Sequence, residues 1–292
     1  MSKNLRDLLH FFVEICTNRE VDPTYRHMAL SFMATAIRFK RQRIQSLKLG
    51  PDLLLAMLHI AMEPDDEDLD EDSPVRLAIV NIDILATSLP PTHVVPPLLE
   101  QFPKLAQSSN PNERRAAMAA LGAVMEGTLE FMTSHIESVL PFVLERLRDS
   151  DASVVRAALN ALSRITEELP NEVISHHSTM VPIVFELLGS HDNEVMKSAC
   201  NTLDAILEWV PKDAVTQYLP KLMEALLFIM TNSEDAEVKV IVAGISFRNQ
   251  TYSSRNWNCR SCLEGRLLSL PRLFHAYLLQ HERSYWRRRL PS

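Results

Sequence analysis

The sequence is poor in glycine, cysteine and long apolar runs, and each shortage removes a class of protein. Six Gly in 292 residues are too few for the many tight turns of an all-β fold. Four Cys are too few for a disulfide framework at this length, so we expect a reducing compartment. No apolar run approaches the roughly 20 residues of a membrane span. The start, MSKNLRDLLHFF, lacks the pattern of a secretory signal.

Positive charge is also scarce in most of the chain. The net charge is −7, but residues 247–292 hold nine Arg, no Lys and two Glu, which is +7. Residues 1–246 therefore carry −14. Such an acidic body argues against direct binding of nucleic acid, which needs basic surface for phosphates. It suits basic protein partners, because the two fields are complementary.

The motifs of common enzymes are absent too. The scattered glycines form no phosphate-binding loop, and no His-Glu-x-x-His metal motif occurs. The tail residues Cys259, Cys262, His275 and His281 do have the C-x₂-C-x₁₂-H-x₅-H spacing of a zinc finger. However, Pro271 would interrupt the helix that should carry the histidines. The sequence therefore predicts a protein that is not an enzyme, with no catalytic residue, no cofactor and no metal site.

What the sequence does contain is a repeat. Three segments begin with Asn or Asp, carry a base five residues later and reach Leu after eleven: NPNERRAAMAAL from Asn110, DASVVRAALNAL from Asp151 and DNEVMKSACNTL from Asp192. Successive starts are 41 residues apart. A second apolar motif precedes each start, as in VPPLLEQF, LPFVLERL and VPIVFELL. A period of 40–47 residues with two helices is typical of HEAT repeats. The predicted fold is therefore an all-α HEAT-repeat solenoid, an armadillo-like superhelix.

The repeat also predicts how the chain is divided. A solenoid is expected over residues 1–246, with units at 4–43, 51–90, 93–128, 134–170 and 175–211 and a broken sixth at 216–246. The pattern stops where Ser246 stands in place of the expected Leu. Residues 247–292 are predicted to be a basic, disordered tail that arises from a gene-model or reading-frame error. A genuine C-terminal extension is the alternative.

Helix starts are marked by local chemistry. Asn110 can cap a helix, Pro111 fits the first helical position, and Glu113 would complete a capping box. The pairs Asp22-Pro23 and Ser73-Pro74 are expected to act as the same start signal. Each second helix should therefore begin at such a signal.

The repeats resemble those of a known family. The run NPNERRAAMAALGAVMEG, followed by HIESVLPFVLERLRDSDASVVRAALNALSRITEELP, is similar to the importin-β superfamily, the karyopherins. The acidic segment EPDDEDLDED before SPVRLAIVNIDILATSLPP is similar as well, and points to the branch that imports ribosomal proteins and histones. The resemblance covers roughly residues 1–245 and implies an internal fragment without the amino-terminal repeats that bind the GTPase Ran.

The resemblance also implies a function. It predicts a fragment of a nuclear transport receptor that binds basic cargo, either ribosomal proteins or histones, and that resides in cytoplasm and nucleus. Nuclear pore proteins are further expected partners, Ran binding is expected to be weak, and no membrane span is expected. The alternative is a general HEAT-repeat scaffold or adaptor subunit.

Two groups of residues are candidates for cargo contact. One is a run of eight carboxylates, which could equally be a solvated loop. The other is the polar stripe of two second helices. The candidates are Glu63, Asp65, Asp66, Glu67, Asp68, Asp70, Glu71, Asp72, Asn160, Arg164, Asn201, Asp204 and Glu208.

Three other polar features have simpler interpretations. A structural ladder between repeats is expected from Asp151, Arg156, Asp192 and Lys197. The adjacent histidines at 176 and 177 are expected to be solvated. The basic cluster RFKRQRIQSLK could be a localisation signal, or its cations could simply favour a helix C-terminus.

Overall fold

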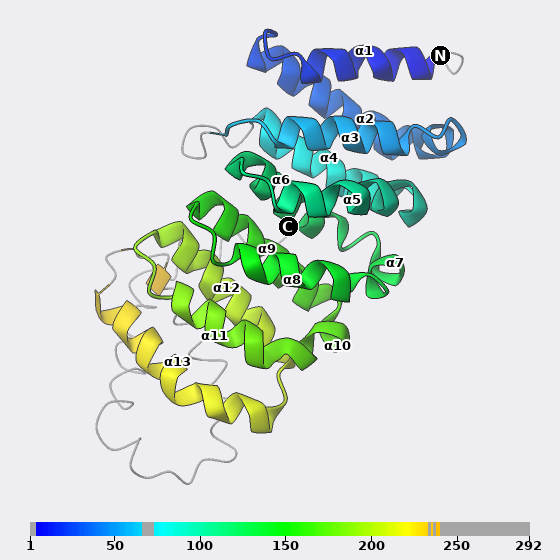
Figure 1. The fold of residues 1–292 in the computed structure, drawn as a ribbon. Helices are drawn as coiled ribbons and strands as arrows, with labels where there is room; N and C mark the ends of the chain where they lie inside the picture. The colour runs from blue at the N-terminus through cyan, green and yellow to red at the C-terminus, as the bar shows by residue number, and fades with distance from the viewer. Residues whose placement is uncertain (1–3, 66–72, 233–234, 236–237, 240–292) are drawn as a thin grey trace, which may run out of the picture. The chain divides into compact units, whose positions relative to one another are not determined.

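The computed structural model describes residues 4–65, 73–232, 235 and 238–239. The chain divides into two compact units, 1–218 and 219–292, and the division falls inside one helix, α13 (Lys212–Asn232). All regular structure in the described residues is helical. Figure 1 shows the helices of the first unit following one another in chain order.

Each repeat contributes a first and a second helix. The first helices are α1 (Leu5–Thr17), α3 (Gly50–Ala61), α5 (Pro91–Ala106), α8 (Ile136–Arg146) and α11 (His177–Leu187). The second helices are α2 (Pro23–Ser46), α4 (Pro74–Ser88), α6 (Pro111–Val124), α9 (Ala152–Glu168) and α12 (Asn193–Trp209). Three short elements lie between repeats: α7 (Leu129–Thr133), α10 (Pro170–Val173) and the 3₁₀ helix η1 (Ile174–His176).

The helices form two layers within the first unit. The second helices pack in the order α2, α4, α6, α9 and α12, and the first helices pack in the order α1, α3, α5 and α8. Between the layers lies a continuous core, whose largest fully buried side chains include Phe102, Leu54 and Ile82. This arrangement confirms the predicted all-α HEAT solenoid, because each pair covers the apolar face of the next.

The expected repeat limits differ from the helices in detail. The helix α2 continues to Ser46 and α5 begins at Pro91, so both run beyond the limits drawn from the sequence. The short elements α7, α10 and η1 were not predicted, because three to five residues are too few for a periodic apolar pattern. The second helix of the sixth repeat and the zinc-like tail residues lie outside the described residues. The division at residue 246 therefore stays a prediction.

Helix starts follow the predicted chemistry with one correction. The Asp22 and Ser73 side chains accept hydrogen bonds from the backbone N–H groups of Thr24 and Arg76. Asn110 likewise accepts one from Asn112. The predicted capping box is wrong, because the Asn110 N–H donates to the hydroxyl of Ser108 at 3.1 Å and not to Glu113. An ST-turn has taken the donor that the box requires.

The adjacent histidines connect neighbouring repeats, which corrects their interpretation as a solvated pair. Nε2 of His176 lies 3.2 Å from the carboxylate of Glu137, 39 residues earlier. Nδ1 of His177 lies 2.9 Å from the hydroxyl of Tyr218, 41 residues later. The two rings point to opposite neighbours because adjacent residues on a helix face different directions. Each contact spans about one repeat.

Small residues set how closely the second helices approach. A Cβ added at Gly122 would lie 3.2 Å from Cα of Ala161, so α6 and α9 are nearly in backbone contact there. A Cβ at Gly127, after α6, would lie 2.3 Å from the carbonyl oxygen of Ala86 in α4. Real side chains essentially never tolerate the second distance. Gly127 is therefore required where two repeats meet.

We predict that Gly127→Ala destabilises the solenoid by about 1–3 kcal/mol, because the backbone must move to admit the methyl group. The matched control is Gly189→Ala, whose Cβ would meet only the Glu186 carbonyl oxygen, at 3.6 Å. Urea denaturation of the whole chain measures both variants. Equal midpoints for the two would show that the approach at Gly127 relaxes freely.

Candidate functional site

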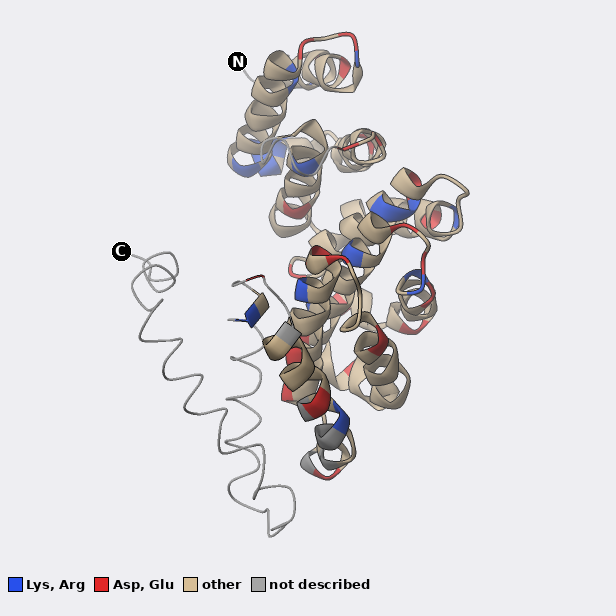
Figure 2. Ribbon diagram, turned by 90° about the vertical axis from the view of Figure 1, so that its left-hand side faces the viewer, with Lys and Arg blue, Asp and Glu red and all other residues tan. Residues whose placement is uncertain are grey.

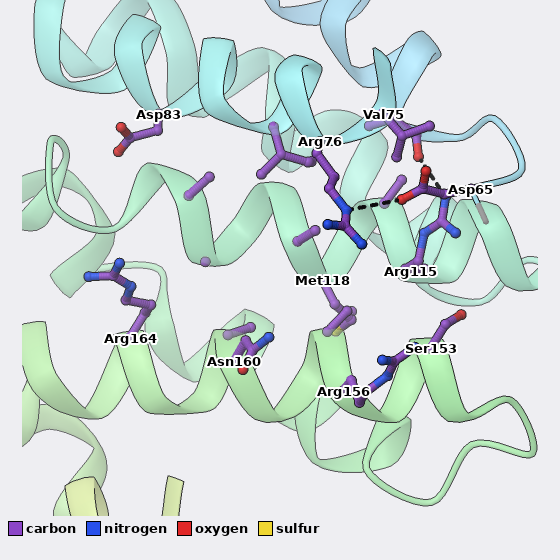
Figure 3. A pocket seen from close by; sticks show the side chains of 18 of the residues that line it. Asp65, Val75, Arg76, Asp83, Arg115, Met118, Ser153, Arg156, Asn160 and Arg164 are labelled. Carbon is purple, nitrogen blue, oxygen red and sulfur yellow. Dashed lines mark hydrogen bonds and ion pairs between the residues drawn. The ribbon is translucent and has the colours of Figure 1, made fainter. Parts of the chain in front are cut away.

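A groove of about 600 Å³ crosses the second helices α4, α6 and α9 and reaches the start of α12. Its floor is made of small side chains, among them Ala119, Gly122 and Ala157, and its rim carries charged ones. Figure 3 shows Asp83 and Arg164 at one end and Asp65, Arg76 and Arg156 at the other. The groove exists because the stacked helices present small residues at equivalent positions, so no long side chain fills it.

One end of the groove holds a half-buried carboxylate whose charged form is disfavoured. Burial raises the pKa of Asp83 above its ordinary value, and the nearby Glu126 raises it further. Arg164 and Arg38 oppose the shift but do not cancel it. A carboxylate in this setting is stabilised by an added cation. This end can therefore accept a positively charged group.

At the other end of the groove, arginine side chains form hydrogen bonds and an ion pair. The Arg115 guanidinium donates to the carbonyl oxygens of Ala61, at 3.2 Å, and Glu63, at 2.6 Å. Burial lowers the pKa of Arg115, and the charges of Asp65 and Asp151 partly offset that effect. Asp65 also lies 3.7 Å from Arg76. These contacts fix where the acidic segment leaves α3.

Glu63 has a structural place, which corrects its interpretation as a cargo contact. The residue is only 6% exposed. Its carboxylate accepts a 2.7 Å bond from Arg26, which is itself buried, and lies 3.5 Å from Nε of Arg19. Arg26 also donates to the carbonyl oxygen of Cys16. Glu63 therefore closes a polar link between the first two repeats and presents little charge to solvent.

The remaining candidates from the acidic run divide in two. Asp65 lines the groove, with its side chain 8% exposed. The rest of the run, at 66, 67, 68, 70, 71 and 72, lies outside the described residues. Their part in cargo contact stays a prediction.

The polar stripes of α9 and α12 differ in their position relative to the groove. Asn160 and Arg164 of α9 are exposed and line the groove. Asn201, Asp204 and Glu208 of α12 lie on its solvent side but are not part of the groove wall. The groove brings together residues of α4, α6 and α9, with Glu194 and Ser198 from the start of α12.

The expected ladder between repeats is realised only in part. Asp151 and Asp192 cap their own helices through Ser153 and Glu194 backbone N–H groups. Lys197 pairs with Glu194 in the same helix at 2.8 Å. The electrostatic effect of Asp151 on Arg115 does connect two repeats. The two aspartates therefore cap their own helices, and with Arg115 and Arg156 they line one hollow.

Sequence reasoning missed Asp83 and Glu126. Asp83 stands alone in an apolar helix, VRLAIVNIDILATS, and carries no pattern of its own. Glu126 does have a signal, because Glu167 and Glu208 follow it at intervals of 41 residues. All three are exposed. The row lies at the ends of α6, α9 and α12, and an alignment on the helix caps would have found it.

The described residues contain no group of three or more His, Cys, Asp or Glu that could hold a metal ion. In the same part of the chain, no helix has the length and apolar character to cross a membrane. Cys16 and Cys200 are buried thiols, and burial raises the pKa of each to about 12. Neither is a reactive thiolate near neutral pH.

The fold and the groove together define a class: a HEAT-repeat solenoid with an open, charged surface on its second helices. Two family models match parts of the chain. One is described as stalled ribosome sensor GCN1-like, HEAT repeats, and matches residues 51–181. The other is described as RNAPII transcription regulator C-terminal and matches residues 134–246.

Individual proteins give a narrower assignment. The probable importin subunit beta-4 of Schizosaccharomyces pombe is 40% identical over 154 residues, which are 53% of this chain and 14% of that protein. Importin-4 of Mus musculus is 25% identical over 144 residues, 44% of this chain and 13% of that protein. The chain thus spans about one seventh of the relatives that it matches.

Solved structures show the same fold. Kap121p bound to RanGTP superposes with a TM-score of 0.76 at 21% identity, covering 86% of this chain and 26% of that one. Kap121p bound to Pho4p superposes with a TM-score of 0.74 at 22% identity, over 84% and 25% of the two chains. This chain is thus similar in sequence to importins over about half of its length, and it has the HEAT-repeat fold of the karyopherin Kap121p.

We predict that Glu63→Gln lowers the free energy of unfolding by about 3 kcal/mol, because the buried Arg26 charge loses its carboxylate partner. The control is Glu14→Gln, since Glu14 is exposed on α1. Thermal melts of both variants measure the effect. A Glu63→Gln variant as stable as the control would mean that Arg26 finds solvent when its partner is removed.

Proposed function

We propose that this chain supplies a cargo-binding surface of a nuclear import receptor, and that the groove across α4, α6 and α9 accepts a basic segment of the cargo. The function is binding and involves no catalysis. Ribosomal proteins and histones are the proposed cargo, with Ran and nuclear pore proteins as further partners and the cytoplasm and nucleus as the location. The names of the importin relatives and of the Kap121p complexes with RanGTP and Nup53p support this assignment.

The observation that carries the proposal is the pairing of Asp83 with Glu126. Burial and mutual repulsion disfavour the charged form of Asp83. A lysine ammonium placed between the two carboxylates would relieve both effects. Lys suits such a site because its charge is compact and sits on a flexible stem, which can enter an open groove.

The row of Glu126, Glu167 and Glu208 extends this acidic surface beyond the groove. Packed helices lie about 8–10 Å apart, and an extended peptide advances about 3.3 Å per residue. A cation at about every third residue of the cargo would therefore meet one glutamate per repeat. We propose that Asn160 orients the same peptide through its amide, which can donate and accept hydrogen bonds.

The remaining carboxylates play a second part in this proposal. The carboxylates at 66–72 would attract basic cargo once it comes within roughly 8 Å, the screening length at physiological salt. Asp65 marks the end of the groove nearest that run. Asn201, Asp204 and Glu208 would meet the part of the cargo that continues along α12.

A general HEAT scaffold is the second candidate. The match of residues 51–181 to GCN1-like HEAT repeats favours it, because that match concerns the repeat itself and not transport. A scaffold of this kind would not select lysine-rich peptides through Asp83 and Glu126. The binding experiment therefore separates the two functions.

We predict that a lysine-rich peptide binds the whole chain at low salt. Asp83→Asn and Glu126→Gln should each weaken binding by about threefold to tenfold, because each removes one of the two carboxylates that the lysine would contact. Titration calorimetry measures the affinities. The matched control is Glu130→Gln, which removes an exposed carboxylate of α7 outside the groove.

Two results would contradict this proposal. One is binding that falls equally in the control and in the groove variants, which would indicate only the net charge of the chain. The other is no preference for a lysine-rich peptide over an uncharged peptide of equal length. Either result would favour the general scaffold.

We further predict that cargo binding releases protons from Asp83. The free protein holds a proton at Asp83 up to a pH above its ordinary pKa of 3.8, while a bound lysine would lower that pKa again. Affinity should therefore rise with pH through this window and level off above it. Calorimetry in buffers of different ionisation enthalpy, at pH values above that ordinary pKa, counts the released protons. Asp83→Asn should abolish the release, and an unchanged count would place the lysine elsewhere.

A further inference from the structure

A basic patch stands at the far end of α2. We define it as the four cations Arg38, Lys40, Arg41 and Arg43 with the aromatic ring of Phe39. All five residues are exposed, and Phe39 is 79% exposed, the most of any large apolar side chain described. Figure 2 shows Lys and Arg gathered on helices near the N-terminus, in a first unit that otherwise carries many carboxylates. The patch thus opposes the charge of the surrounding body.

The helix dipole does not account for this patch. Cations favour the last turn of a helix, and α2 ends at Ser46, so only Arg43 lies in that turn. Lys40 has non-helical backbone angles, φ −117° and ψ 19°, and interrupts the helix there. The interruption leaves Lys40 and its neighbours exposed where a regular helix would turn one of them toward Ile37 and Ile44.

The patch is also not neutralised within the protein. Among the described residues, no salt bridge involves Lys40, Arg41 or Arg43. Arg38 acts on Asp83 in the groove. Three cations and one exposed ring therefore remain available to a partner.

The action of Arg38 on Asp83 also locates the patch. A charge effect of this kind requires the two side chains to be near each other. Asp83 lies at the acidic end of the groove. The patch therefore borders the end of the groove at which we place the cargo lysine.

We propose that the basic patch binds a short acidic segment of the same cargo chain whose basic segment occupies the groove. This inference rests on the proposed function and specifies the cargo class: a basic stretch flanked on one side by acidic residues with an apolar side chain among them. The carboxylates would pair with Lys40, Arg41 and Arg43, and the apolar side chain would cover Phe39.

The size of the patch favours a peptide over nucleic acid. Six residues of helix span about 9 Å, which matches three or four residues of an extended peptide. Nucleic acid would need a longer row of cations for its phosphates. A long polyanion would also be repelled by residues 1–246, which carry −14. A short acidic segment meets only the patch.

The experiment compares four peptides on the whole chain at low salt. One has a lysine-rich segment alone. Two carry an acidic flank with one Phe, at either the amino or the carboxyl end, and the fourth carries a Ser/Gly flank of equal length. We expect one acidic orientation to bind about threefold to tenfold tighter than the Ser/Gly peptide, with the gain fading as salt rises.

Charge-reversal variants test whether the gain in affinity from the acidic flank comes from the basic patch. Arg41→Glu should remove most of it, whereas the control Lys104→Glu, which reverses an exposed cation of α5 outside the patch, should leave it intact. The triple variant K40E/R41E/R43E should lose the gain and should recover it with a flank in which Lys replaces the acidic residues. Neither variant should alter binding of the lysine-rich peptide alone by more than the control does.

The outcomes separate the two proposals. If the lysine-rich peptide binds and neither acidic flank adds affinity, the patch proposal is overturned and the groove proposal stands. If the lysine-rich peptide does not bind, the groove proposal fails, and an acidic peptide offered alone then tests the patch. Binding that Arg41→Glu weakens supports the patch, and no binding overturns it. A single-stranded oligonucleotide that binds more tightly through the same residues would overturn the assignment to a peptide.

Discussion

No helix pair in this chain can bury its apolar faces alone, and the rest of the structure depends on that constraint. Each pair leaves one face for the preceding repeat and one for the following repeat, so stability comes from nearest neighbours. Close approach is what makes the stacking effective, as at Gly122 and Ala161, where the α6 and α9 backbones nearly touch. The same small residues that permit this approach form the floor of the groove. The binding surface is thus a direct product of the packing.

Hydrogen bonds and ion pairs fix how neighbouring repeats align within this apolar stacking. Arg114 donates two hydrogen bonds to the carboxylate of Asp149, at 2.7 and 2.8 Å, and two more to the carbonyl oxygens of Ser108 and Ser109. Burial alone would raise the pKa of Asp149, but the bonds from Arg114 hold it below its ordinary value. With the link from Arg26 to Glu63, these contacts join the turn of one repeat to the next. A slipped register would leave buried charges without partners.

The sequence predicts structural features that recur in every repeat. It does not predict contacts that occur only once. The 41-residue step from Asn110 to Asp151 predicts the helix pairs, because capping and apolar spacing are local properties. The burial of Glu63 could not be predicted, since it depends on Arg26 from another repeat. Asp83 carries no local signal, and its pKa is raised first by burial and then by Glu126, which follows a different helix. The acidic run looked like one feature, yet its first carboxylate belongs to the interior.

The groove crosses α4, α6 and α9 and reaches the start of α12, so its walls belong to separate repeats. Its width is therefore set by the angle between successive helix pairs. A small change in that angle, repeated at each interface, would open or close the rim while leaving every local contact nearly intact. Asp83 in α4 and Arg164 in α9 stand on opposite sides of this rim. The distance between these two side chains therefore changes with the curvature of the solenoid.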